Sequence, residues 1–139
     1  MEGYKLIPEI ATADVAFEAE SKKLGRLFEI CAEAMFDIMI ERKNVKNKVK
    51  KIIKIEEENN EKLLYSFLEE LIFLKDSESL VFGKFEVEIN ENKLKATCYG
   101  EEVDPERHLI KVDVKAVTFH MFYLRQEKAL WKVRIVLDI

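Results

Sequence analysis

Apolar and polar residues alternate with a period of two in several parts of the chain, and this pattern predicts β-strands. The first such stretch covers residues 13–20, after a break at Pro8. Residues 45–55 combine β-branched side chains with five lysines, a composition that favours a charged strand near the edge of a sheet. From Leu80 onward the same period continues almost to the last residue. The C-terminal half is therefore expected to be mostly sheet.

Three turn signals divide this C-terminal half. They are residues 90–92, the stretch that contains Gly100 and Pro105, and residues 126–128. Gly, Pro and Asn at such positions are typical of hairpin connections and turns. The alternation between the turns predicts one long strand over about 109–124 and a last strand over 131–137, whose odd-numbered side chains point inward.

Two segments have apolar residues at every third or fourth position, which predicts amphipathic helices. The first has Ser21 as its expected N-cap and runs to about Ile40. Gly25 lies inside this helix at a cost of about 1 kcal/mol relative to alanine, which indicates that another element packs closely there. The second helix covers residues 62–75, after Asn60 as its expected cap.

The 139 residues fit a single domain, residues 1–139, and two helices packed on a mostly antiparallel sheet give it an α+β fold. Charged residues make up 36% of the chain, but the net charge is −4, so a protein is a better partner than bare nucleic acid. Cys31 and Cys98 lack metal-type spacing and are expected to be buried, reduced thiols. No signal peptide or membrane span is expected, and the predicted localisation is cytoplasmic.

Several ordered segments resemble the archease family, and together they span nearly the whole chain. They are Thr-Ala-Asp at 12–14, LLYSFLEEL at 63–71 followed by Lys75 and Asp76, LVF at 80–82, Gly100 and Glu101, Asp-Pro-Glu-Arg-His at 104–108, KAVTFH at 115–120 and Leu-Asp-Ile at 137–139. One departure is Ala11, where the family often has a histidine. Any role of that histidine is therefore absent here.

The resemblance implies an α+β fold of strand-helix-strand-strand character, which agrees with the periodicity. It also implies a function, that of a non-enzymatic activator of an RtcB-type tRNA-splicing RNA ligase. Such an activator promotes guanylylation and multiple turnover of the ligase, which is the expected partner, and tRNA is contacted only indirectly. A tRNA cytosine methyltransferase is a second partner that the resemblance implies.

The family's divalent-metal site corresponds to Asp14, Asp138 and the terminal residue Ile139. Carboxylate oxygens without a thiolate or paired imidazoles suit Ca²⁺ or Mg²⁺ better than zinc. Without the resemblance, an exposed aspartate at a strand end is usually only a turn or solubility residue. Two other functions stay open: a small hydrolase that uses Asp14 and Asp138 around a cation, and a chaperone-like modulator of the methyltransferase. The lack of a Gly-rich phosphate loop and a nucleophile elbow counts against the enzyme.

The two histidines are expected to have different environments. His120 follows the apolar face of the long strand, which suggests either a hydrogen-bonded residue at the rim of the core or a contact to a ligand or partner. His108 follows a turn and is expected to be structural or solvent-facing. Neither histidine has a nearby Ser or Cys that would form an activated nucleophile.

Two groups of charged residues invite a functional interpretation but have a simpler one. The acidic residues Glu69, Glu70 and Asp76 could act as acid or base, yet on an amphipathic helix they are expected to form the solvated face. The lysines between residues 46 and 54 could contact phosphate, but the acidic run 56–58 that follows opposes a clean basic stripe. A solvated sheet edge is the expected arrangement of these lysines.

Overall fold

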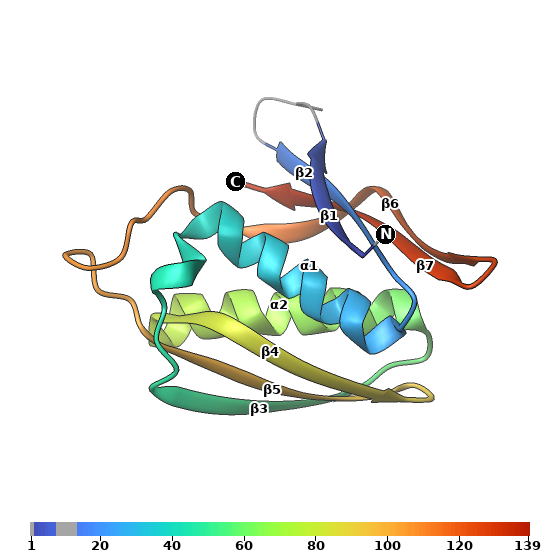
Figure 1. Ribbon diagram of the computed structural model, residues 1–139, viewed down its shortest axis with the longest axis horizontal. Coiled ribbons are helices and arrows are strands. Elements are labelled where there is room, and N and C mark those ends of the chain that lie inside the picture. Colours follow the sequence, from blue (N-terminus) through green and yellow to red (C-terminus); the bar gives the residue numbers. More distant parts are fainter. Residues whose placement is uncertain (1, 8–13) are drawn as a thin grey trace.

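The computed structural model describes residues 2–7 and 14–139, and it places two helices between two antiparallel sheets (Figure 1). The elements in chain order are β1 (Gly3–Ile7), β2 (Asp14–Ser21), α1 (Leu24–Met39), the short 3-10 helix η1 (Arg42–Asn44), β3 (Val49–Glu56), α2 (Asn60–Glu78), β4 (Leu80–Asn90), β5 (Lys93–Glu102), β6 (Ala116–Glu127) and β7 (Leu130–Asp138). One sheet has the strand order β1-β2-β7-β6 and the other β3-β5-β4. The expected α+β fold is confirmed, with two sheets where one was expected. None of the helices in the described part combines the length and apolar character that a membrane crossing needs.

The helix caps differ from those expected. Residue Lys23 is the N-cap of α1 and makes no side-chain cap. The expected cap, Ser21, is instead the last residue of β2, where its hydroxyl donates to Glu2 Oε2 at 2.7 Å. For α2 the N-cap is Asn59 rather than Asn60, and its side chain accepts a backbone hydrogen bond of the first turn at 2.8 Å. Both corrections are small because the apolar stripe, not the cap, positions each helix.

Helix α1 covers the outer edge of β4, and the close packing expected at Gly25 is confirmed there. A Cβ at Gly25 would lie 2.8 Å from the carbonyl oxygen of Val87, so only glycine fits there. Beside it the backbone N–H of Val87 donates to Glu29 Oε2 at 2.8 Å, and Arg42 Nη1 donates to the carbonyl of Gly83 at 2.8 Å. Edge groups that would otherwise be free to pair with another chain are satisfied by α1 and by Arg42 of η1.

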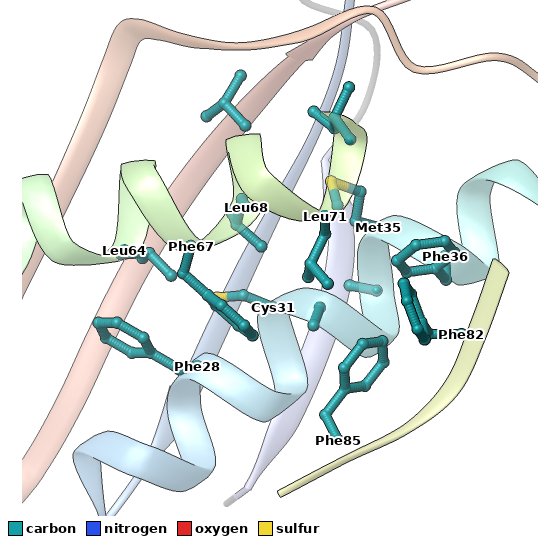
Figure 2. Close-up of a cluster of buried hydrophobic side chains, with 14 of the residues drawn as sticks. Phe28, Cys31, Met35, Phe36, Leu64, Phe67, Leu68, Leu71, Phe82 and Phe85 are labelled. Carbon is teal, nitrogen blue, oxygen red and sulfur yellow. The ribbon is translucent and has the colours of Figure 1, made fainter. Parts of the chain in front are cut away.

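Aromatic rings join the helices to the three-stranded sheet in the core (Figure 2). Residue Phe28 of α1 stacks with Phe67 of α2 at a centroid distance of 6.2 Å. Residue Phe36, also from α1, packs at 5.8 Å against both Phe82 and Phe85 of β4. Each of these contacts joins residues far apart in the sequence, so the core fixes the layer order of the fold.

Both cysteines are buried in this core and form no disulfide, as expected. Burial raises the pKa of the Cys98 thiol to about 12 and raises that of Cys31 as well. A thiol must ionise to act as a nucleophile or metal ligand. Neither cysteine is therefore suited to chemistry near neutral pH.

The prediction of a long strand over 109–124 is wrong for its first half. Strand β6 begins at Ala116, and the preceding residues are an irregular connection that crosses the end of α1. Their backbone pairs locally: the N–H of Glu41 donates to Leu109 O at 2.9 Å, and the N–H of Lys111 donates to Met39 O at 2.8 Å. The alternating pattern misleads here because Ile110 lies 53% exposed.

Three other strand features complete the comparison. Strand β3 lies at the edge of its sheet, as expected, whereas β1 is an edge strand that the periodicity did not indicate. Gly100, expected in a turn, lies inside β5, where a Cβ would clash with the carbonyl oxygen of Val81. Pro105 is in a turn, as expected. The expected break at Pro8 and the positions of residues 11–13 lie outside the described residues.

Candidate functional site

The two aspartates expected at a metal site are direct partners across the sheet. Asp14 opens β2, Asp138 closes β7, and the two residues face each other in the antiparallel register. On the other side of Asp138 lies Ala116 of β6. Directly opposite residues have Cβ atoms about 4.5–5.5 Å apart on the same face of a sheet. The fold thus brings together two carboxylates separated by most of the sequence.

This pair belongs to the outer face of the four-stranded sheet, away from the helices. Its neighbour Leu137 points into the core and is fully buried, and successive side chains of a strand point to opposite faces. The next row on the outer face contains Ala16 and Val136, which are 2% and 0% exposed. The partly buried carboxylates therefore adjoin a row of apolar side chains, where water screens a charge less than in bulk solvent.

The pair has no cationic side chain to balance it in the part of the chain that the structure describes. Neither Asp14 nor Asp138 forms an ion pair within 4 Å there. Like charges directly opposite each other in an antiparallel pair destabilise a sheet. No group of three or more His, Cys, Asp or Glu side chains that could hold a metal occurs in residues 2–7 and 14–139. Any third charged donor among these residues has to come from the main chain.

Ile139, the third residue of the predicted metal site, follows Asp138 directly. Its side chain packs against the core, which holds the end of β7 in place. The adjacent carbonyl of Asp138 accepts the backbone N–H of Lys115 at 2.8 Å. Together these contacts hold the end of β7 next to the aspartate pair.

Glu69 was expected on the solvated face of its helix, but its side chain binds the backbone of β6. Its Oε2 accepts the backbone N–H of Val117 at 2.8 Å. Val117 follows Ala116, the residue opposite Asp138, so Glu69 of α2 anchors the start of β6 beside the aspartate pair. No sequence signal distinguishes Glu69 from Glu70 on the same helix.

A second contact between α2 and the entrance to β6 is made by Lys75. Its Nζ donates to Asp113 Oδ1 at 2.5 Å and to the carbonyl of Val114 at 3.0 Å. The same ammonium pairs with Asp76 at 2.7 Å, and Asp76 is exposed, as expected. The strand that borders the aspartate pair is therefore tied to α2 at two successive points.

His108 belongs to a buried ionic cluster. Of the two expected environments, structural or solvent-facing, it therefore has the structural one. Its Nδ1 accepts the backbone N–H of Asp104 at 2.8 Å, so Nε2 carries the proton and donates to Glu101 Oε2 at 2.9 Å. The hydrogen bond from Arg107 is the largest of the effects that hold the pKa of Glu101 at about 2, aided by the backbone N–H of Lys46. Both ring nitrogens of His108 are thus engaged within the protein.

One of the two sequence interpretations placed His120 at the rim of the core, and the structure does not bear it out. His120 lies in residues 119–122, where the register of β6 against β7 breaks, and its side chain is exposed. In the same bulge Met121 has a positive φ of 55°, and Phe119 is 55% exposed and stacks on Tyr65 at 4.5 Å. The alternation that placed His120 on the apolar face ends at this bulge.

A pocket of about 350 Å³ lies on the same sheet but does not include the aspartate pair. It is lined by residues that include Tyr4, Glu18, Tyr123 and Lys132. Within it, Glu18 accepts hydrogen bonds from Tyr123 and from Arg134, the latter at 2.9 Å. Several charged residues of this pocket have partners: Glu18 also pairs with Lys5, and Arg125 and Lys132 both pair with Glu127.

Comparisons with known proteins agree in pointing to one family. A model of the Archease protein family matches residues 4–139. The protein archease of Pyrococcus furiosus is 41% identical over 133 residues, which cover 92% of this chain and 94% of that protein. The protein archease of Methanothermobacter thermautotrophicus is 38% identical over 143 residues, and all of both chains is covered.

Solved structures show the same similarity. The solution structure of Methanobacterium thermoautotrophicum protein 1598 has a TM-score of 0.86 at 38% identity, and the match covers all of both chains. The crystal structure of an archease from Thermotoga maritima, described as a possible chaperone, has a TM-score of 0.66 at 21% identity over 96% of each chain. This second likeness concerns the fold alone.

Proposed function

The chain belongs to the archease family, and on that premise we propose that it is a protein cofactor of an RtcB-type RNA ligase and not itself an enzyme. In this proposal a divalent cation, Ca²⁺ or Mg²⁺, is held by Asp14, Asp138 and the main-chain carboxylate of Ile139. The cation neutralises the aspartates and gives this edge of the sheet the charge and shape that the ligase recognises.

The observation that carries the proposal is the cross-strand pairing of Asp14 with Asp138. Two carboxylates in direct opposition repel each other, and a cation between them would convert this repulsion into attraction. Oxygen donors without sulfur or imidazole suit hard cations. Main-chain carbonyls and water would complete the six to eight ligands that are typical of Ca²⁺.

Three groups that a hydrolase could use besides the two aspartates are unavailable for catalysis. Both nitrogens of His108 are engaged, one by a backbone N–H and one by Glu101. Cys31 and Cys98 are buried, and their pKa values are raised. A general base has to reach the proton that it abstracts, which a ring buried in an ionic cluster cannot do.

The test uses Asp14→Asn and Asp138→Asn, which remove one charge each and keep the shape of the side chain. Glu20→Gln is the matched control, because Glu20 lies on the same strand and the same face as Asp14 but opposite Lys132. Calorimetric titration with Ca²⁺ and with Mg²⁺ should show at least tenfold weaker binding for either aspartate variant, a loss of about 1.4 kcal/mol or more. The control should bind like the parent.

The same three variants are then added to an RtcB-type ligase in a multiple-turnover RNA-joining assay. Asp14→Asn and Asp138→Asn should lose most of the stimulation, and Glu20→Gln should keep it. Stimulation by both aspartate variants equal to that of the parent, in Mg²⁺ or Ca²⁺, would refute the metal site. Metal-dependent hydrolysis of a phosphoester by the chain alone, lost in Asp14→Asn, would instead establish the hydrolase alternative.

A further inference from the structure

The outer face of the three-stranded sheet concentrates positive charge in a protein that is acidic overall. This face lies opposite the helices, at the bottom of Figure 1. The face exposes five lysines and three glutamates; Lys84, Glu86 and Glu88 come from β4 and Glu56 from β3. The other four lysines are Lys50 and Lys54 of β3 and Lys93 and Lys95 of β5. None of the four forms an ion pair within 4 Å across the described residues, although the net charge of the chain is −4.

The register of the sheet places these lysines close to one another. Lys54 lies directly opposite Lys95, and Lys93 is two residues from Lys95 on the same face, about 7 Å along the strand. Directly opposed like charges destabilise a sheet, whereas Lys95 also faces Glu88 of β4, and Lys93 faces Glu56. Lys54, Lys93 and Lys95 line a pocket of about 460 Å³ together with Glu56 and Glu88.

The same face exposes apolar surface among the lysines. Ile52 is 52% exposed, and Tyr99 lies opposite Lys50 in the centre of the sheet. The Tyr99 ring lies 5.2 Å from Lys84 Nζ, and its hydroxyl donates to Glu86 at 3.0 Å. An aromatic ring on an open sheet face, next to flexible cations, is the arrangement on which single-stranded nucleic acids stack their bases.

The acidic residues that follow β3 in the sequence are mostly turned away from this face. Glu57 accepts a hydrogen bond from Ser66 of α2 at 2.7 Å, and Glu58 pairs with Lys62 of the same helix. Glu56 of β3 and Glu88 of β4 remain on the face, opposite Lys93 and Lys95. The fold therefore turns two acidic residues away from this face, and its lysines outnumber its carboxylates.

We propose that this lysine face, made of Lys50, Lys54, Lys93 and Lys95 with Tyr99 at its centre, binds single-stranded RNA. The lysines contact backbone phosphates without base specificity, and a base stacks on Tyr99 once the Lys84 side chain moves aside. RNA fits better than an acidic peptide for two reasons. The face has no arginine, whose planar fork is preferred for carboxylates, and it has an aromatic platform that an acidic peptide does not need.

The inference goes beyond the proposed function, in which RNA is contacted only through the ligase. It is also independent of the metal site, because the aspartate pair lies on the outer face of the other sheet, with both helices between. Binding of a cation at Asp14 and Asp138 can therefore fail or succeed without changing the expectation for RNA.

The test measures binding of a fluorescein-labelled, unstructured RNA of about 12 nucleotides, a length within the usual range for such sites. Fluorescence anisotropy is followed between about 50 and 200 mM KCl. With four phosphate contacts, log Kd should change with log[KCl] with a slope of about 2.8, so affinity falls about 50-fold over this range. Lys54→Gln combined with Lys95→Gln should halve the slope and leave only about a sevenfold fall.

The matched control combines Lys22→Gln with Lys128→Gln, which makes the same charge change at exposed lysines outside the three-stranded sheet. It should keep the slope of the parent. The melting temperature of the Lys54/Lys95 variant should stay close to that of the parent, because the repulsion between Lys54 and Lys95 and the attraction between Lys95 and Glu88 are removed together. An unchanged melting temperature shows that lost binding is not lost folding. Tyr99→Leu should weaken binding at least fivefold at constant salt with an unchanged slope, and Tyr99→Phe should not.

Three results would overturn the proposal. One is that the parent does not bind the RNA at 50 mM KCl, and another is that the Lys54/Lys95 variant and its control share one salt slope. The third is that a polyglutamate peptide of the same charge displaces the RNA as well as unlabelled RNA does. That outcome assigns the lysine face to an acidic protein partner.

Discussion

Replacing Glu101 with glutamine is expected to destabilise the connection that leads from the three-stranded sheet to β6. The Glu101 side chain is 3% exposed and binds Arg107, the ring of His108 and the backbone N–H of Lys46. Glutamine has nearly the same shape but no charge, and its amide group adds a donor where only donors surround it. The variant therefore leaves buried donors without an acceptor and Arg107 without its counter-charge.

The expected magnitude follows from the pKa of Glu101, which the structure lowers from 4.5 to about 2, mainly through the hydrogen bond from Arg107. Lowering the pKa of this carboxyl from 4.5 to about 2 corresponds to about 3 kcal/mol of folding free energy. This agrees with the loss of about 3–5 kcal/mol that is typical when one partner of a buried ion pair is removed. Because the folded-state pKa is the lower one, the stabilisation is fully present above pH 4.5 and is lost as the pH falls towards 2.

Urea unfolding followed by circular dichroism at several pH values measures this effect. At pH 7 the Glu101→Gln variant should be less stable than the parent by about 3 kcal/mol, with a melting temperature lower by about 10 °C. The difference from the parent should shrink as the pH falls below 4.5. Glu102→Gln is the control, because Glu102 is the next residue in β5 but is exposed; it should unfold like the parent. Equal unfolding of the two variants at pH 7, or a difference that does not depend on pH, would refute the reasoning.

Three further predictions concern packing and the proposed metal site. Gly25→Ala should destabilise the protein by about 1–3 kcal/mol in urea unfolding, despite the higher helix propensity of alanine, because the new Cβ would meet the Val87 carbonyl at 2.8 Å; a stabilised variant would contradict the close packing. Asp138→Asn should raise the melting temperature in EDTA by removing the repulsion with Asp14, and should abolish the increase that Ca²⁺ gives the parent; an unchanged Ca²⁺ effect would argue against the site. A short tag after Ile139 should weaken Ca²⁺ binding in calorimetry relative to an N-terminal tag, because a peptide carbonyl replaces a carboxylate; equal affinities would remove that carboxylate from the site.

The helices and most strands could be predicted because their apolar residues are buried with a regular period. The stripe of α2 and the alternation of β4 and β5 both match the side chains that the structure buries. Strand β1 gave no such signal because it is a short edge strand whose Leu6 is 58% exposed. The alternation before β6 was misleading for the opposite reason: Ile110 and Val112 alternate in the sequence, but the backbone there pairs with the end of α1 and leaves both side chains exposed.

The metal-site residues came from the resemblance to a family, and the sequence alone could not have paired them. Asp14 and Asp138 lie at opposite ends of the chain, and their opposition depends on the antiparallel register of β2 and β7. That register is set by which residues of each strand face the core, since a shift by one residue would turn Leu137 outward. Burial of Phe17, Ile135 and Leu137 in one core thus fixes the geometry of a polar pair on the other face of the sheet.

The lysine face shows the same dependence on register in the other sheet. A sum over the sequence gives a net charge of −4, and by this measure a nucleic-acid partner is disfavoured. A sheet, however, sends alternate residues to one face, and pairing of β3 with β5 brings Lys54 and Lys95 together while Glu57 and Glu58 turn to α2. Electrostatic attraction is felt over about a Debye length, about 8–10 Å at physiological salt, so a bound strand responds to the charges of one face and not to the total. The net charge of the whole chain therefore does not exclude a nucleic-acid contact at a face on which five lysines outnumber three glutamates.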